Sequence, residues 1–191
     1  MTEGANGVMF RRLRYMLTPQ WDLYSSIATR IVGGGVLEVG FGTGAGVLQY
    51  AHRANWVDAL EVDPEAVKFA KLTWPVENVN WIEGDILSYE TDHRYTKAVA
   101  VEVLEHIPKW HDALENIRTH LLPEGILYMT FRNANADLSR WTDLHERELT
   151  GEELATHLKV HFREVYLYDW SLQKLQDKDT HMTPLIAACR Q

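Results

Sequence analysis

Apolar residues along the chain fall into short runs separated by amphipathic segments. The runs are rich in Val, Ile, Leu, Tyr and Trp, which is typical of β-strands. Between most of them lie segments with helical spacing, such as the one that places Leu114, Ile117 and Leu121 on one face. The pattern predicts strands at 35–39, 56–62, 79–83, 97–103 and 125–131, and helices at 44–54, 64–73 and 110–121.

Capping signals predict where two helices begin. Asp63 stands directly before Pro64, which combines an N-cap acid with a proline at the first helical position. Thr150 and Glu153 have the spacing of a capping box, in which each side chain bonds the backbone of the other residue. We therefore expect a second capped helix over 150–161.

The order of these elements predicts a doubly wound α/β sheet. Strands separated by helices pair in parallel through crossover connections. The run at 97–103 shows little alternation, as expected of a strand covered on both faces. Two late strands at 163–170 and 182–189 are separated by a polar segment without a helical apolar stripe. These two strands are expected to form an antiparallel hairpin.

The 191 residues form a single domain by length and contain no clear linker. A helix at 18–32, with Pro19 at its first position, precedes the first strand. We therefore expect one domain over residues 1–191.

Composition and charge exclude several classes of protein. The formal net charge of −8 argues against a broad nucleic-acid surface, although Arg11, Arg12 and Arg14 could form a local basic patch or a solvated helix face. The only cysteine, Cys189, excludes a disulfide framework and a zinc–cysteine site and suggests a reducing, cytoplasmic setting. Apolar stretches are too short to cross a membrane, and no signal-peptide core is visible.

Three alternating glycines follow the first predicted strand, in "VLEVGFGTGAG" at 36–46. Glycine lets the backbone approach a ligand closely, and ligands of open α/β sheets bind beyond the carboxyl ends of the strands. This predicts a nucleotide-like ligand. Gly40, Gly42 and Ala45 also fit a dinucleotide fingerprint, with Glu61 about 20 residues later, so the glycines alone leave a nicotinamide-dependent reductase open.

Acidic residues near the other strand ends favour a different ligand. Glu38 stands two residues before Gly40, where a carboxylate would repel a pyrophosphate but could attract a cationic amino group. Asp85 follows the third strand and could accept a hydrogen bond from an adenine amine. The stretch "VEVLEHIP" at 101–108 follows the fourth. The set suits a ligand with an adenine, a ribose and a positive charge, and without phosphate.

With these pieces in order, the chain resembles the class I S-adenosylmethionine-dependent methyltransferases. The matching segments are "VLEVGFGTGAG", "ALEVDPEAVKFA", "VNWIEGDIL", "AVAVEVLEHIP" and "LLPEGILYMTF", which lie between residues 34 and 132. The resemblance implies a Rossmann-like, mostly parallel seven-stranded sheet with a C-terminal antiparallel hairpin strand. One departure is "RYTKAV", where the family usually has an aromatic residue followed by Asp.

The resemblance also implies roles for individual residues toward S-adenosyl-L-methionine. Glu61 would hold the ribose hydroxyls, while Asp63 is a competitor better used as a helix cap. Asp85 would face the adenine amine, with Ile86 and Val62 near the ring; a plain turn acid and an ordinary strand residue are the alternatives. The full set of implied cofactor contacts is Glu38, Gly40, Phe41, Gly42, Gly44, Glu61, Val62, Asp85, Ile86 and Glu102.

Methyl transfer from a sulfonium needs alignment first and a base only if the acceptor must lose a proton. His106 is the best-placed candidate base, with helix capping or cofactor support as its alternative role. His145 lies in "DLHERELTGEEL", a stretch similar to one that borders the acceptor pocket in related enzymes; Arg147 and Glu148 there could simply form ion pairs.

A metal site is not predicted. Glu102, Glu105 and His106 resemble part of the metal site of small-RNA 3′-end 2′-O-methyltransferases, but the spacing supplies no further histidine.

The resulting prediction is an S-adenosylmethionine-dependent methyltransferase that acts on an oxygen or nitrogen of a small-molecule acceptor, with no nucleic-acid or membrane partner. The resemblance also implies that residues 1–32 form an N-terminal helical lid segment. The alternatives are a protein or RNA acceptor, or a catalytically idle cofactor-binding partner subunit.

Overall fold

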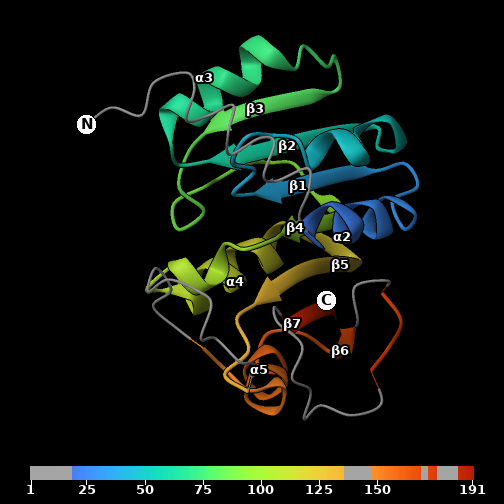
Figure 1. The fold of residues 1–191 in the computed structure, drawn as a ribbon, viewed down its shortest axis with the longest axis vertical. Helices are drawn as coiled ribbons and strands as arrows, with labels where there is room; N and C mark the ends of the chain where they lie inside the picture. The colour runs from blue at the N-terminus through green and yellow to red at the C-terminus, as the bar shows by residue number, and fades with distance from the viewer. Residues whose placement is uncertain (1–18, 136–147, 169–171, 176–184) are drawn as a thin grey trace.

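The structure, a computed structural model, describes residues 19–135, 148–168, 172–175 and 185–191. Its described strands form one seven-stranded sheet in the order β3-β2-β1-β4-β5-β7-β6 (Figure 1). Strands β1 to β5 pair in parallel, and β7 runs antiparallel to both β5 and β6. This confirms the predicted sheet and its C-terminal hairpin. The strands are β1 (Gly35–Val39), β2 (Trp56–Glu61), β3 (Val79–Glu83), β4 (Tyr95–Ala100), β5 (Leu121–Phe131), β6 (Glu164–Tyr168) and β7 (Leu185–Arg190).

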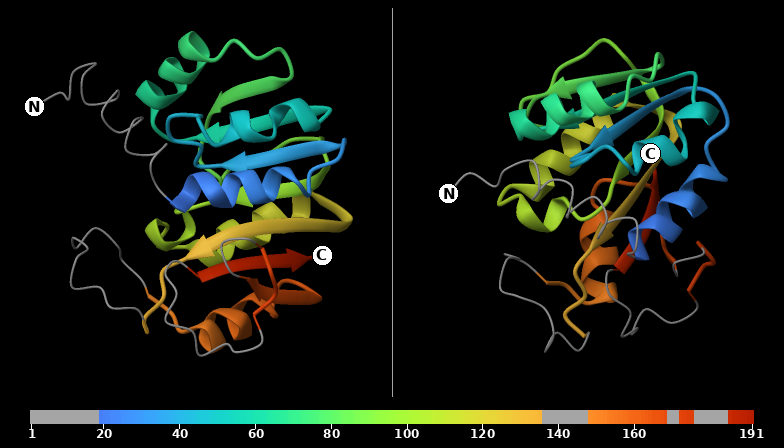
Figure 2. Two further views of the ribbon diagram at one scale, coloured as in Figure 1. Left: turned by 45° about the vertical axis from the view of Figure 1, so that its right-hand side comes forward. Right: turned by 45° about the horizontal axis from the view of Figure 1, so that its top comes forward.

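Helices cover both faces of the sheet (Figure 2). One core cluster joins α2, α3 and two short 3₁₀ turns to one face, and the other joins α4 and α5 to the opposite face. In β1, Val36 belongs to the first cluster, while Leu37 and Val39 belong to the second. The helical elements are α2 (Pro19–Ala28), η1 (Val47–Gln49), η2 (Ala51–Arg53), α3 (Pro64–Thr73), η3 (Leu104–His106), α4 (Trp110–His120) and α5 (Gly151–Leu158).

Both predicted helix caps are present. The Asp63 carboxylate accepts a hydrogen bond from the Glu65 backbone N–H at 2.9 Å, and Pro64 opens α3. At α5 the Thr150 hydroxyl accepts from the Glu153 N–H, and the Glu153 carboxylate accepts from the Thr150 N–H. Among the helices in the described ranges, none is long and apolar enough to cross a membrane.

Several predicted elements differ from the structure in their bounds, and two of the differences have a clear physical cause. The single helix expected over 44–54 is replaced by η1 and η2, because Tyr50 between them takes a non-helical conformation (φ −126°, ψ −8°). The strand expected over 97–103 spans Tyr95–Ala100, and a short turn, η3, precedes the helix expected over 110–121, which begins at Trp110 as predicted. Pro108 disfavours helical geometry in the preceding residue, so the chain forms a 3₁₀ turn first.

Candidate functional site

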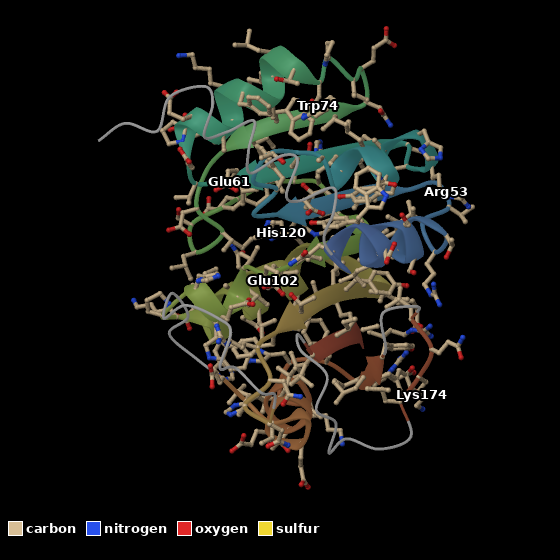
Figure 3. All side chains as sticks on the ribbon, viewed as in Figure 1. Arg53, Glu61, Trp74, Glu102, His120 and Lys174 are labelled. Atoms are coloured by element: carbon tan, nitrogen blue, oxygen red, sulfur yellow. The ribbon has the colours of Figure 1, made fainter. Side chains whose placement is uncertain are left out.

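A cavity of about 470 Å³ opens at the carboxyl ends of the parallel strands, on the side where Figure 3 shows Glu61 and Glu102. This is the position at which open α/β sheets bind ligands, and the volume suits a small molecule. Among the described residues that line it, none is lysine or arginine. They are Val39, Gly40, Gly42, Leu60, Glu61, Val62, Gly84, Asp85, Ile86, Leu87, Glu102, Val103, His106, Ile107 and Pro108.

Glu61 ends β2 with its carboxylate fixed against the cavity wall. One oxygen accepts hydrogen bonds from the backbone N–H groups of Val62 (2.8 Å) and Asp63 (3.1 Å). The other accepts from the Gly42 N–H at 2.9 Å. The glycine loop and the end of β2 are thereby held together by a single side chain.

The glycine loop contributes two of its glycines to the cavity. Gly40 has a φ of +70°, donates its N–H to the Leu60 carbonyl at 2.8 Å, and has no room for a side chain because of Val103. A side chain at Gly42 would meet nothing within 4 Å, so this residue faces open space. Phe41 and Gly44 instead pack on Trp81 and do not line the cavity.

Glu38 is fully buried and lies behind the cavity wall. The hydroxyls of Tyr24 and Tyr50 donate to its two carboxyl oxygens at 2.5 and 2.6 Å. Burial raises the pKa of Glu38 to about 8, and the two tyrosine hydrogen bonds offset only part of that shift. Sequence reasoning expected this residue to contact the cofactor, and no pattern in the sequence indicated its tyrosine partners.

Asp85 and its neighbours form the wall beyond β3. The Asp85 carboxylate accepts from the Leu87 N–H at 2.9 Å, so it shapes a turn while it lines the cavity. Ile86 is buried, whereas Val62 on the facing wall is 67% exposed. Asn116 of α4, which sequence reasoning missed, donates to the carbonyls of Ile86 (2.6 Å) and Tyr89 (2.9 Å).

Two glutamates from the segment after β4 form an acidic pair. Glu102 lines the cavity, and burial raises its pKa. Glu105 is buried, and its carboxyl oxygens lack a hydrogen bond of normal geometry from any described group, although the backbone N–H groups of Glu105 and Val103 act to lower its pKa. Burial, followed by repulsion from Glu102, raises the pKa of Glu105 to about 8.

Thr130 of β5 holds Glu102 in an unusual backbone conformation. Glu102 has a φ of +57°, which is costly for a residue with a side chain. Its N–H donates to the Thr130 hydroxyl at 2.7 Å, and that hydroxyl donates to the Glu102 carboxylate at 3.3 Å. Thr130 is fully buried, and no local signal in the sequence pointed to it.

Of the two candidate bases, only His106 lies within the described residues. His106 is exposed and lines the cavity beside Ile107 and Pro108. His145 lies outside the described residues. Glu148, which lies in the same stretch and is within the described residues, pairs with Arg132 at 2.8 Å next to the end of β5. No group of three or more His, Cys, Asp or Glu side chains in the described ranges could hold a metal ion.

Comparison with known proteins places this geometry in context. A sequence model of the methyltransferase domain matches residues 9–183. (S)-Coclaurine N-methyltransferase of Papaver somniferum is 30% identical over 117 residues, which are 56% of this chain and 32% of that enzyme. The alignment therefore spans about a third of the length of that relative.

Solved structures share the fold over most of the chain. The N-methyltransferase NodS from Bradyrhizobium japonicum WM9, in complex with S-adenosyl-L-homocysteine, superposes with a TM-score of 0.63 at 24% identity, covering 95% of this chain and 87% of that one. The DhpI–SAH complex superposes with a TM-score of 0.71 at 19% identity, covering 93% and 86%.

Proposed function

Because the chain belongs to the methyltransferase-domain family, we propose that it transfers a methyl group from S-adenosylmethionine to a nitrogen or oxygen of a small-molecule acceptor. The membership confirms the resemblance that the sequence predicts, and with it S-adenosylmethionine as the cofactor of the family. The observation that carries the proposal is the lining of the cavity beside the glycine loop. Three carboxyl side chains line this cavity, and none of its described lining residues is lysine or arginine.

The lining residues fit this cofactor better than a dinucleotide. A pyrophosphate would meet Glu61, Asp85 and Glu102 without a basic side chain among the described lining residues to offset its charge. In contrast, a ligand with two vicinal hydroxyls, an adenine amine and a net positive charge would find carboxyl oxygens that accept its hydrogen bonds and attract its charge. Glu61 would hold the ribose hydroxyls and Asp85 the adenine amine.

Apolar walls and backbone complete the proposed cofactor site. Ile86 and Val62 would contact the two faces of the adenine, while Gly40 and Gly42 would let the backbone approach the rest of the molecule. Glu102 and His106 line the part of the cavity that follows β4. We assign that part to the acceptor.

The bound cofactor would supply a methyl group on a positively charged sulfur. The residues of this chain would bind and orient the cofactor and the acceptor and would exclude water from them. They would not need to activate the leaving group. Ile107 and Pro108 form apolar lining next to Glu102 and His106, where an acceptor must enter. The side chains that could accept a proton from it are His106 and Glu102.

Within this proposal, nitrogen is the favoured acceptor atom. Glu102 and Glu105 form an acidic pair, and Arg132, the basic group that acts on both, is already paired with Glu148. Such a pair favours a cationic amine over a neutral hydroxyl and could take up its proton before transfer. Two of the similar proteins, coclaurine N-methyltransferase and NodS, are named as N-methyltransferases.

A turnover assay tests this function. Purified protein is incubated with S-adenosylmethionine labelled on the methyl carbon and matched panels of small amines and phenols. We expect label transfer to amines, and the rate should fall at least about tenfold in Glu102→Gln, because a charged hydrogen-bonding group is lost. Transfer only to phenols would contradict the preference for nitrogen. Cofactor binding without transfer to either panel, or transfer only to a protein or an RNA, would contradict the small-molecule assignment.

A further inference from the structure

Glu38 is a buried carboxyl group whose neighbours, Val39 and Gly40, line the cavity although Glu38 itself does not. Its two oxygens are taken by tyrosines from different elements. Tyr24 belongs to α2, and Tyr50 lies in the segment that follows the glycine loop. Direct contact between Glu38 and a ligand would require displacing these hydroxyls.

The three side chains form a closed junction beneath the loop. Glu38 and Tyr50 are fully buried and Tyr24 is 2% exposed. The two tyrosine rings stack with centroids 6.4 Å apart and planes inclined by 12°. The hydrogen bonds at 2.5 and 2.6 Å lie at the short end of the range for O–H···O contacts.

The junction lies at both ends of the glycine loop. Glu38 lies two residues before the loop residues 40–46 and Tyr50 four residues after them, so one carboxyl group ties the segment before the loop to the segment after it. Tyr24 adds helix α2, which lies beside the sheet near β1 and β4 (Figure 1). At Gly46, a Cβ atom would stand 2.5 Å from Cζ of Tyr24, so the tyrosine ring packs directly on the loop backbone.

We propose that Glu38 is a positioning residue that clamps the glycine loop through Tyr24 and Tyr50, so that cofactor affinity depends on the docking of helix α2. The proposal rests on the proposed function, because it requires the cofactor to bind at this loop. Gly40, Gly42 and Gly44 all have positive φ, and glycines restrain a loop poorly by themselves. A clamp that orders the loop beforehand lowers the entropy lost on binding.

Three variants loosen the junction without removing the carboxyl group. Tyr24→Phe and Tyr50→Phe each delete one hydroxyl and keep the ring. Gly46→Ala acts through packing alone, because Gly46 has helical φ and ψ (−63°, −44°) that alanine adopts readily, while its methyl group would collide with Tyr24. If all three variants weaken cofactor binding, the effect comes from the junction as a whole and not from the loss of one particular side-chain group.

Tyr95→Phe is the matched control. Its hydroxyl also donates to a buried carboxylate, Asp58, at 2.7 Å, and the Tyr95 side chain is fully buried in the same sheet. Neither residue lines the cavity. The control therefore reproduces the loss of a buried tyrosine–carboxylate hydrogen bond at a distance from the glycine loop.

The experiment measures the Kd for S-adenosylhomocysteine by calorimetry, and the Tm, for the wild-type protein and the four variants. We expect at least about a fivefold rise in Kd for Tyr24→Phe, Tyr50→Phe and Gly46→Ala, and an unchanged Kd for Tyr95→Phe despite a comparable fall in Tm. A rise below fivefold in either tyrosine variant, or an equal rise in the control, overturns the clamp. Absence of binding by the wild-type protein overturns the proposed function, and the inference with it.

Discussion

At the scale of single residues, the acidic groups of the cavity are held by hydrogen bonds from backbone N–H groups or from a neighbouring strand. Thr130 is the clearest case, since one hydroxyl accepts from the Glu102 N–H and donates to the Glu102 carboxylate. This hydrogen bond lowers the pKa of Glu102 against the effect of burial, which raises it. Thr130 is thus expected to set the pH range in which Glu102 is a carboxylate.

Thr130→Val should shift the pH dependence of methyl transfer. If Glu102 accepts a proton, the rate rises with pH through its pKa, and losing the hydroxyl raises that pKa. The rising limb of kcat/KM against pH should therefore move to higher pH in Thr130→Val and return in Thr130→Ser. An unchanged limb in Thr130→Val, with only a lower Tm, would show that Thr130 merely supports the fold.

Sequence alone identified the cavity residues that follow strand ends. Asp85 could be predicted because a carboxyl group after a parallel strand lies at the ligand end of the sheet, and Glu61 because the resemblance to the methyltransferases implies it. Thr130, Asn116 and Tyr24 could not, because their roles depend on contacts between segments far apart in the chain. Local sequence patterns do not indicate such contacts.

At the scale of elements, helix α4 braces the wall of the cavity from behind. Asn116 donates to two carbonyls of the turn that follows β3, and this turn carries Asp85 and Ile86. The brace links a helix on one face of the sheet to the loop that would hold the adenine. Its loss should therefore affect both stability and cofactor affinity.

Asn116→Ala is predicted to lower the free energy of unfolding by about 1–2 kcal/mol, because two partly buried carbonyls lose their donor. The Kd for S-adenosylhomocysteine should also rise several-fold. Asn78→Ala is the matched control, since Asn78 donates to the carbonyls of Ala51 and Ala54 at the far end of the sheet. Urea unfolding and calorimetry check both effects; equal changes in Kd for the two variants would refute the brace.

Element boundaries were predicted well where local signals decide them and poorly where tertiary contacts do. The helix 64–73 and the strands 35–39 and 79–83 match the structure residue for residue, because their caps and apolar runs are local. The segments at 44–54 and 97–109 differ, and both adjoin the glycine loop or the acidic pair. Tertiary contacts there, such as that of Tyr50 with Glu38, replace the local preference for helix.

At the scale of the whole molecule, the sheet direction and the hairpin could be predicted, while the strand order could not. Alternation of strands and helices implies parallel pairing, but it does not say which strand lies beside which. The observed order places β1 and β4 side by side at the centre. Glu38 and the residues after β4 consequently reach one region of the molecule.

Two buried acids whose pKa is raised, Glu38 and Glu105, should make stability depend on pH. Burial raises the pKa of Glu38 and Glu105 from 4.5 to about 8, so between these values the folded state binds more protons than the unfolded state. The free energy of unfolding should therefore fall as pH rises from about 5 to about 8, by up to about 1.4 kcal/mol per pH unit for each residue.

Urea unfolding at several pH values measures this slope. Glu105→Gln keeps the shape of the side chain but removes its titration, so the decline should become shallower. Glu77→Gln, at an exposed position, should leave the slope as in the wild-type protein. Stability that is flat or increases from pH 5 to pH 8 would contradict the burial of these groups as neutral acids.

The central claim is that Glu61 and the glycine loop bind S-adenosylmethionine, and calorimetric titration with S-adenosylhomocysteine tests it most directly. We predict binding by the wild-type protein, at least about tenfold weaker binding by Glu61→Ala, and no binding of NADH. Glu83→Ala, at the exposed end of the neighbouring strand in register with Glu61, should bind like the wild-type protein. Binding of NADH without binding of S-adenosylhomocysteine, or an unchanged Kd in Glu61→Ala, would contradict the account.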